Sequence, residues 1–337
     1  MNNFKKIGMT ALAASLVSTS VFAGEMTVKG KAAMNYESYS AADSNTTASD
    51  GTKAFSMGNQ ITFSGSGEMD NGMTVKLSFT LDQNDDKAKD DQTTAGNYGS
   101  GAPFDGHSVS ISSDAMGTLK YFGEGGDSAQ NAVGDTAAGN IWDLWDKRNG
   151  KSSKLKESNG GTNFHYTLPT MVDGLAVAAS YQPAGTNDES DTAYSLVYTG
   201  VDGLSVSYGH GSNDSAAGGD ANSDTTSIKL SYVYGSVTLA YSDHEHDSAT
   251  NTSDQDAEAW KLSYAVSDDI SVTYAQEEIK SADTSLAETA EYSRLSASYT
   301  SGGMTVSGNV STMDNGTQTT AVAGDEEYVG LSLGFAF

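Results

Sequence analysis

Apolar residues alternate with small or polar residues along most of the chain, starting at Met26. At the C-terminal end, Val329, Leu331, Leu333 and Phe337 fall on one phase of this alternation, and small or polar residues occupy the other. A period of two is typical of β-strands whose two faces meet different surroundings. The pattern predicts sixteen strands, which begin near residues 26, 55, 73, 105, 118, 162, 174, 191, 203, 224, 236, 257, 270, 290, 303 and 326.

The connections between these predicted strands alternate between short and long. Seven are tight turns near residues 70–72, 115–117, 172–174, 201–203, 234–236, 267–269 and 301–303. Their Gly, Asn and Asp residues tolerate the positive φ of hairpin turns. The other eight are longer and rich in polar residues. This alternation is typical of a transmembrane β-barrel with short periplasmic turns and long external loops.

Tyrosines near the strand ends favour a membrane barrel over a soluble β-sandwich, which would also show a period of two. Tyr208 and Tyr241 close strands at the external end, whereas Tyr232 and Tyr264 lie near the opposite end. Two membrane interfaces produce two such aromatic girdles. We therefore predict an all-β, 16-stranded antiparallel transmembrane barrel. A barrel of this width is not filled by side chains, so it encloses an aqueous channel.

Residues 1–23 have the pattern of a cleaved secretory signal peptide. Lys5 and Lys6 precede a short apolar stretch, and small residues occupy the cleavage positions that end at Ala23. The apolar stretch is too short to cross a bilayer as a helix. We expect an exported protein with a single barrel domain over residues 24–337.

The composition excludes several other classes of protein. The chain has 44 acidic and 18 basic residues and a formal net charge of −26. Nucleic-acid binding is disfavoured, because phosphate neutralisation needs clustered Lys and Arg. Without Cys the chain has no disulfide, thiolate metal site or thiol nucleophile. No nucleophile–histidine–acid set is evident, so we expect neither an enzyme nor a cofactor.

The basic residues within the predicted strands share the inward phase of the alternation. Four of them lie on early strands, where we expect a basic wall that steers ions: Lys29, Lys31, Lys76 and Lys120. Three more basic residues lie on the inward phase and are therefore expected to face the lumen: Lys229, Lys261 and Arg294. A cation facing lipid at mid-depth costs about 2–4 kcal/mol, which explains the absence of cations from the outward phase.

The longest connection, the third loop, runs from about Glu124 to Gly161 and combines charged with aromatic residues. It contains Trp142 and Trp145, which would be unfavourable in a fully solvated loop. We expect this segment to pack either inside the barrel or against a neighbouring subunit. A loop of this length is usually functional.

The signal peptide, the sixteen-strand pattern, the long third loop and the terminal Phe337 together resemble the general porins of Gram-negative outer membranes. The segment from Asn163 to Pro169, followed by Gly174 and Tyr181, also looks like the strand–turn–strand segment of that family. The resemblance covers essentially the whole chain after residue 23. The terminal aromatic residue is similar to the signal that the barrel-assembly machinery reads.

The resemblance implies a homotrimer of passive diffusion channels in the outer membrane, in contact with lipid and lipopolysaccharide. Each channel would be narrowed by the third loop, whose acids face a basic cluster on the opposite wall. Carried onto this chain, the loop acids are Glu124, Asp127, Asp135, Asp143 and Asp146, and the wall is Lys29, Lys31, Lys76 and Lys120. The chain departs from the family in having only two arginines, Arg148 and Arg294. The lysine ammonium is a more mobile point charge than the planar guanidinium of arginine. The resemblance therefore implies a positively charged wall in this chain, but not the fixed arrangement of charges that stacked arginines give.

Two alternative functions stay open at this point. The lysine wall also suits a solute-selective pore, such as a phosphate or other anion channel. The acidic loops would suit a structural or adhesive barrel with a closed lumen.

Three further motifs carry little weight. The sequence from Gly330 to Gly334 matches G-x-S-x-G but falls inside the last predicted strand, not at a strand-to-helix turn. We expect His244 and His246 in a solvated loop, without the further ligands of a metal site. The acids between Asp82 and Asp91 lack the spacing of an EF-hand calcium loop.

Overall fold

The structure is a computed structural model that describes residues 24–40, 53–82, 104–145, 161–183, 190–214, 222–249, 254–283, 285–286, 288–319 and 324–337. The predicted signal peptide, residues 1–23, lies outside this described part. The strands of the first half are β1 (Met26–Tyr39), β2 (Lys53–Glu68), β3 (Thr74–Asp82), β4 (Phe104–Ser113), β5 (Gly117–Gly126), β6 (Gly161–Thr167), β7 (Leu175–Gln182) and β8 (Asp191–Tyr198). Those of the second half are β9 (Leu204–Asn213), β10 (Ser223–Tyr234), β11 (Val237–Asp247), β12 (Gln255–Ala265), β13 (Ile270–Ser281), β14 (Ala290–Ser301), β15 (Met304–Asp314) and β16 (Glu326–Ala336).

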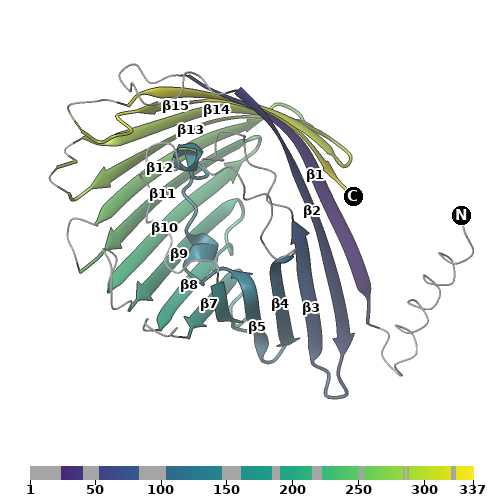
Figure 1. Ribbon diagram of the computed structural model, residues 1–337. Coiled ribbons are helices and arrows are strands. Elements are labelled where there is room, and N and C mark those ends of the chain that lie inside the picture. The colour runs from purple at the N-terminus through teal and green to yellow at the C-terminus, as the bar shows by residue number, and fades with distance from the viewer. Residues whose placement is uncertain are drawn as a thin grey trace, which may run out of the picture.

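These strands form one closed barrel in which each strand pairs antiparallel with its neighbours in the chain (Figure 1). The ring is closed by β1 and β16, which pair from Lys31↔Ala336 to Tyr39↔Tyr328. The observed strands begin within two residues of the predicted positions, which confirms the predicted 16-stranded barrel. The agreement follows from the alternation itself, because a strand that slipped by one residue would turn its apolar face inward.

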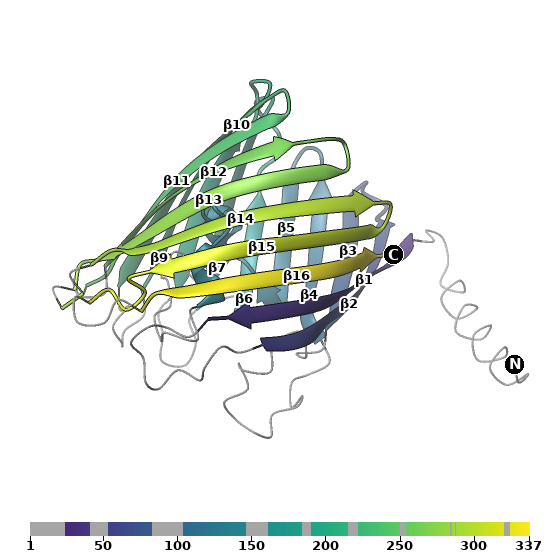
Figure 2. The ribbon, with the colours of Figure 1, turned by 90° about the horizontal axis from the view of Figure 1, so that it is seen from above.

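Short and long connections gather at opposite ends of the barrel, here called the turn end and the loop end (Figure 2). Most of the tight turns contain a glycine with positive φ, such as Gly72, Gly174 and Gly235. Both ends of the barrel domain lie at the turn end, where Gly30 and Phe337 exchange two backbone hydrogen bonds of 2.7 and 2.9 Å.

The two faces of the wall differ as the alternation predicts. Outward side chains in the middle of the strands are large, apolar and exposed, for example Val28, Leu77, Leu230 and Leu331. Lipid would cover these side chains in a membrane. Inward side chains are mostly small or hydroxylated, and facing hydroxyls bond to each other across strands, as in the Ser64–Ser78 pair at 3.1 Å. In the described part of the chain, no helix is long and apolar enough to cross a membrane.

The third loop folds back inside the ring of strands, where its teal segment carries the short 3₁₀ helices η2 (Asn131–Val133) and η3 (Ile141–Leu144) (Figure 1). Its buried side chains Ile141 and Trp145 form the main apolar cluster together with inward residues of β11 to β16. Several of these wall residues are alanines, such as Ala259 and Ala275. Small side chains on this wall leave the space that the loop fills.

Candidate pore constriction

Glu277 holds the tip of the third loop against the barrel wall. It lies on the inward phase of β13, and only 1% of its surface is exposed. One carboxylate oxygen accepts a hydrogen bond of 2.5 Å from the Thr136 hydroxyl, and the other accepts one of 3.1 Å from the Trp142 backbone N–H. The Ile141 backbone also donates to this carboxylate. One buried carboxylate thus fixes both ends of the segment from Thr136 to Trp142.

The same segment is closed on itself by side-chain contacts. The Thr136 N–H donates to Asn140 Oδ1 at 2.9 Å, and the Asn140 N–H donates back to Thr136 Oγ1 at 3.0 Å. Asn140 Nδ2 also donates to Asp135 Oδ1 at 2.8 Å. The loop tip is therefore a small rigid unit with its charged residues at set positions.

Further contacts attach the rest of the loop to the same side of the lumen. The Ala137 N–H donates to Ser242 Oγ at 2.8 Å, and Lys229 Nζ donates to the Asp135 carbonyl at 2.8 Å. Closer to β5, Gln130 Nε2 donates to Ser227 Oγ at 2.9 Å.

Aromatic packing fixes the far end of the described loop. Trp145 is 1% exposed and lies between the rings of Tyr292 and Tyr328, with centroid distances of 5.9 and 6.4 Å. The Tyr39 hydroxyl donates to the Leu144 carbonyl at 3.0 Å. The tryptophans thus pack inside the barrel, which is one of the two arrangements that the sequence allowed.

Two of the four predicted wall lysines lie in one row of the sheet. Lys76 pairs with Ser110, which pairs with Lys120, which pairs with His165. Because neighbouring strands are about 4.8 Å apart, the two lysines are separated by about 10 Å at the backbone. Lys120 Nζ lies 3.9 Å from the centre of the Phe122 ring and interacts electrostatically with Lys76 and Asp127. His165 was missed from the sequence and belongs to this group.

The other two predicted wall lysines lie on the inward phase of β1. Lys29 pairs with Thr62, and Lys31 pairs with Gln60. Gln60 Nε2 in turn donates to Asp82 Oδ2 at 3.3 Å. These lysines therefore lie in rows other than that of Lys76 and Lys120.

The remaining inward cations lie across the lumen, on the wall that carries the third loop. Arg294 Nε donates to Ser311 Oγ at 3.3 Å and interacts electrostatically with Glu277 and Asp143. Lys261 lies in the same row as Arg294, separated from it by Ala275.

The predicted loop acids divide into three groups. Asp127, Asp135 and Asp143 are exposed on the third loop inside the barrel. The structure places Glu124 apart from them, because the register of β4 and β5 shifts at His107 and pairs Glu124 with this histidine. Glu124 Oε2 lies 3.8 Å from His107 Nδ1, on the outward phase that His107 shares with Phe79. Asp146 lies outside the described residues.

His244 and His246 are not in a solvated loop, so that expectation was wrong. Both lie on the inward phase of β11 and are buried, and His244 shares Ser227 with Gln130 of the third loop. His244 Nδ1 lies 2.8 Å from Ser227 Oγ, and His246 Nδ1 lies 2.8 Å from Thr225 Oγ1. Within the described residues, no group of three or more His, Cys, Asp or Glu side chains could hold a metal ion.

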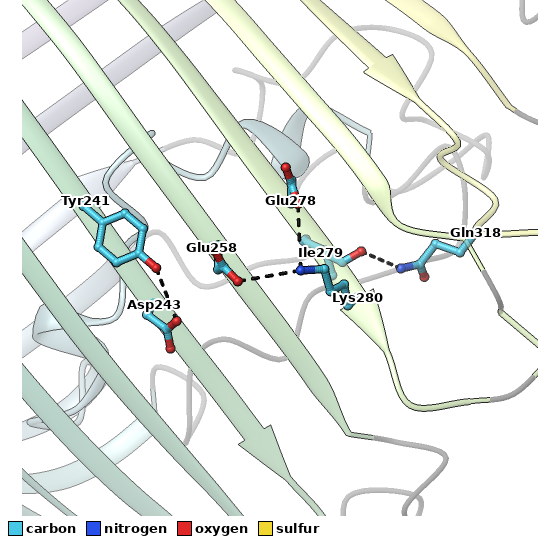
Figure 3. A network of polar contacts seen from close by, with 7 residues as sticks. All are labelled: Tyr241, Asp243, Glu258, Glu278, Ile279, Lys280 and Gln318. Atoms are coloured by element: carbon cyan, nitrogen blue, oxygen red, sulfur yellow. Dashed lines mark hydrogen bonds and ion pairs between the residues drawn. The ribbon is translucent and has the colours of Figure 1, made fainter.

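Carboxylates occupy the outward face at the loop end of β11 to β14. Asp243 pairs with Glu258, Glu258 with Glu278, and Glu278 with Glu291. Lys280 Nζ lies 3.6 Å from Glu258 Oε1 and 3.9 Å from Glu278 Oε2 (Figure 3). So many charged side chains on the outward face would be unfavourable in lipid, so this part of the wall lies beyond the hydrocarbon layer of the membrane.

Comparisons with known proteins agree with this architecture. The sequence profile of Gram-negative porins matches residues 8–337. The fold is similar to that of a variant porin from Rhodopseudomonas blastica, with 16% identity and a TM-score of 0.63 over 93% of this chain and 100% of that one. A porin from Comamonas acidovorans described as anion-selective gives 18% identity and a TM-score of 0.63 over the same shares. At these identities the likeness shows the fold alone. No curated protein sequence matches the chain.

Proposed function

Because the chain belongs to the Gram-negative porin family, we propose that its barrel is a water-filled channel of the outer membrane, through which ions and small hydrophilic solutes diffuse passively. The observation that carries this function is the closed sixteen-strand ring whose lumen is narrowed by the third loop. Side chains do not fill a ring of this width, so water and solutes occupy the rest. Transport through it needs no energy input, and selectivity follows from the width and charge of the narrow part.

Reconstitution into a planar lipid bilayer tests this function. Folded protein should give discrete conductance steps that grow with salt concentration. Folded protein without such steps would overturn the channel and would favour a structural barrel with a closed lumen.

Asp127, beside Lys120 and His165, and Asp143, beside Arg294, would line the constriction. Lys76, Lys120 and His165 line one stretch of wall, and Asp127 interacts electrostatically with two of them. Opposite charges on the two sides of a narrow passage create a transverse field, which favours small polar solutes that can align their dipoles. Asp135, Lys29 and Lys31 would contribute more distant charge.

A second candidate function, an anion-selective pore, is favoured by the row of Lys76, Lys120 and His165. Substituting Lys76 and Lys120 together with Gln should shift the reversal potential in a KCl gradient toward cation preference. The matched control is Lys280→Gln, because Lys280 faces outward and lies far from the lumen. An unchanged reversal potential in the double variant would reject this role of the lysines.

We place the trimer contact on the outward face of β1 to β3. Phe55 is 82% exposed, its ring lies 5.0 Å from that of Tyr36, and the Phe63 and Phe79 rings stack at 5.0 Å. The loop end of β11 to β14 carries carboxylates on its outward face instead. An aromatic surface suits a second copy of the chain, whereas the carboxylates, together with Lys280, lie at the height of the polar headgroup layer. Native mass spectrometry in detergent should find three chains per particle, and a monomer mass would overturn the homotrimer.

Export and assembly complete the proposal. Cleavage of the signal peptide after Ala23 would leave Gly24 as the first residue, which intact-mass measurement of the exported protein checks. Phe337 would be the residue that the barrel-assembly machinery reads, and its deletion should leave the protein unassembled in the periplasm.

A further inference from the structure

The five histidines of the chain meet different surroundings, and all five lie in the described part. His107 and His210 are on the outward face of the barrel, away from the lumen. His244 and His246 face inward but are only 1% and 4% exposed. His165 lies on the inward phase of β6 and is half-buried. It is therefore the one histidine that lines the open lumen.

The position of His165 places it inside the proposed constriction. It pairs with Lys120 of β5 on one side and with Ser180 of β7 on the other. It also interacts electrostatically with Lys120 and with Asp127 of the third loop. Because neighbouring strands are about 4.8 Å apart, a charge on its ring would lie close to both of these charged side chains.

Charged groups face His165 from the strands on both sides and from the third loop. On β5 the nearest is Lys120, which in turn interacts with Lys76 of β3. The third loop contributes Asp127. Across β7, the one acid of β8 is Asp191, two residues nearer the loop end than the row of His165. Together these groups set the pH at which the imidazole gains its proton.

A proton on His165 changes the charge of this group by a large fraction. Lys76, Lys120 and Asp127 together carry a net charge of +1, and a protonated His165 would raise it to +2. Histidine is the side chain whose ordinary titration falls between pH 5 and 8. Carboxylates with ordinary values near 4 stay ionised over most of that range. The lumen thus has one side chain suited to change its charge near neutral pH.

We propose that His165 is a specificity-determining residue, which makes the ion selectivity of the channel depend on pH. Above about pH 7 its imidazole is neutral, and the row contributes only its two lysines. In mild acid it becomes a third cation of the row and shifts the channel toward anions. This inference rests on the proposed channel function and adds to it a condition under which the selectivity changes.

The size of the effect follows from the distance between the ring and the path of the ions. In water, a unit charge about 8 Å from the path changes the local concentration of a monovalent ion about twofold. It raises the concentration of chloride and lowers that of potassium. Screening weakens this effect over about 10 Å at 0.1 M salt. The permeability ratio of chloride to potassium should therefore rise at least twofold when His165 is protonated.

Reversal potentials of the reconstituted wild-type protein test the proposal. They are measured in a KCl gradient at or below about 0.1 M, at pH 8 and at pH 5. The permeability ratio of the wild type should rise at least twofold from pH 8 to pH 5, and His165→Gln should lose this rise. The matched control is His210→Gln on the outward face, where the ring lies 3.7 Å from Asp224. This control should respond to pH as the wild type does.

A permanent charge at the same position makes the test two-sided. At pH 8, His165→Lys should already show the permeability ratio that the wild type reaches at pH 5. A wild type without a pH response, or a His165→Gln channel that keeps the response, would overturn the proposal. If one variant does not assemble, the other still decides, because Gln predicts a loss in acid and Lys predicts a gain at pH 8. Conductance steps report separately on the channel, so failure of the His165 role and failure of the channel are distinguishable.

Discussion

The contact between Glu277 and the third loop gives the sharpest prediction about the pore. In Glu277→Gln, the side chain keeps its shape but loses its charge, and one of its two acceptor oxygens becomes a donor. Hydrogen bonds to a charged group contribute about 1.5–3 kcal/mol each, against about 0.5–1.5 kcal/mol between neutral groups. Glu277 accepts from Thr136, Ile141 and Trp142. The substitution should therefore weaken docking of the loop tip by about 2–3 kcal/mol, the sum of a small loss in each bond.

Single-channel recording measures this loss directly. Because 1.4 kcal/mol corresponds to a factor of about ten in an equilibrium constant, the time that the channel spends in altered conductance levels should rise by about 30- to 100-fold. The matched control is Glu278→Gln, the same substitution one residue along β13, on the outward face. Thr136→Val should produce part of the effect and should add little to Glu277→Gln, because both act on one contact. Traces of Glu277→Gln that match those of the wild type and of Glu278→Gln would refute the role of this carboxylate.

Three further substitutions test the packing of the loop and the closure of the barrel. Trp145→Ala should weaken docking of the loop by about 3–5 kcal/mol, because contact with Tyr292 and Tyr328 is lost. The single-channel conductance should then fluctuate more than in the wild type, while the barrel should still resist unfolding by SDS at room temperature. Ala259→Leu should displace the loop at a cost of about 1–3 kcal/mol, because no space remains beside this 2% exposed position; a conductance equal to that of the wild type would contradict the packing. Gly303→Val should lower the temperature at which the barrel unfolds in SDS, because a Cβ at Gly303, just before β15, would lie 2.5 Å from the backbone oxygen of Ala336 in β16, whereas Gly65→Val, in open space, is the matched control and should change it little.

The barrel was predictable from the sequence because the alternation of apolar and polar residues within each strand determines which face turns outward. Nothing comparable marks the path of the third loop. Its aromatic residues indicate that it packs, but the surface that receives Trp145 is assembled from β14 and β16, more than a hundred residues further along the chain. Glu277 was missed for the same reason, since a single carboxylate on the inward phase looks like any solvated residue of the lumen.

Irregular pairing explains the other differences between expectation and structure. The shift between β4 and β5 near His107 changes the phase after Phe122 and turns Glu124 away from the loop acids. β11 continues to Asp247, further than its apolar residues indicate, because its loop end alternates outward carboxylates with buried inward histidines. Neither a bulge nor a strand that extends beyond the lipid is marked by hydrophobic alternation.

The pairing of β1 with β16 has a consequence for how the protein is made. The first strand to leave the ribosome has half of its backbone partners in the last strand, about 300 residues later, so the seam is the most non-local contact of the fold. Chain entropy opposes such a contact until the intervening strands are in place. Since the terminal Phe337 supplies two of the seam's hydrogen bonds with Gly30, a truncated chain would leave an open sheet edge. The ring therefore closes only after β16 is available, and a chain without β16 would stay exposed to proteases.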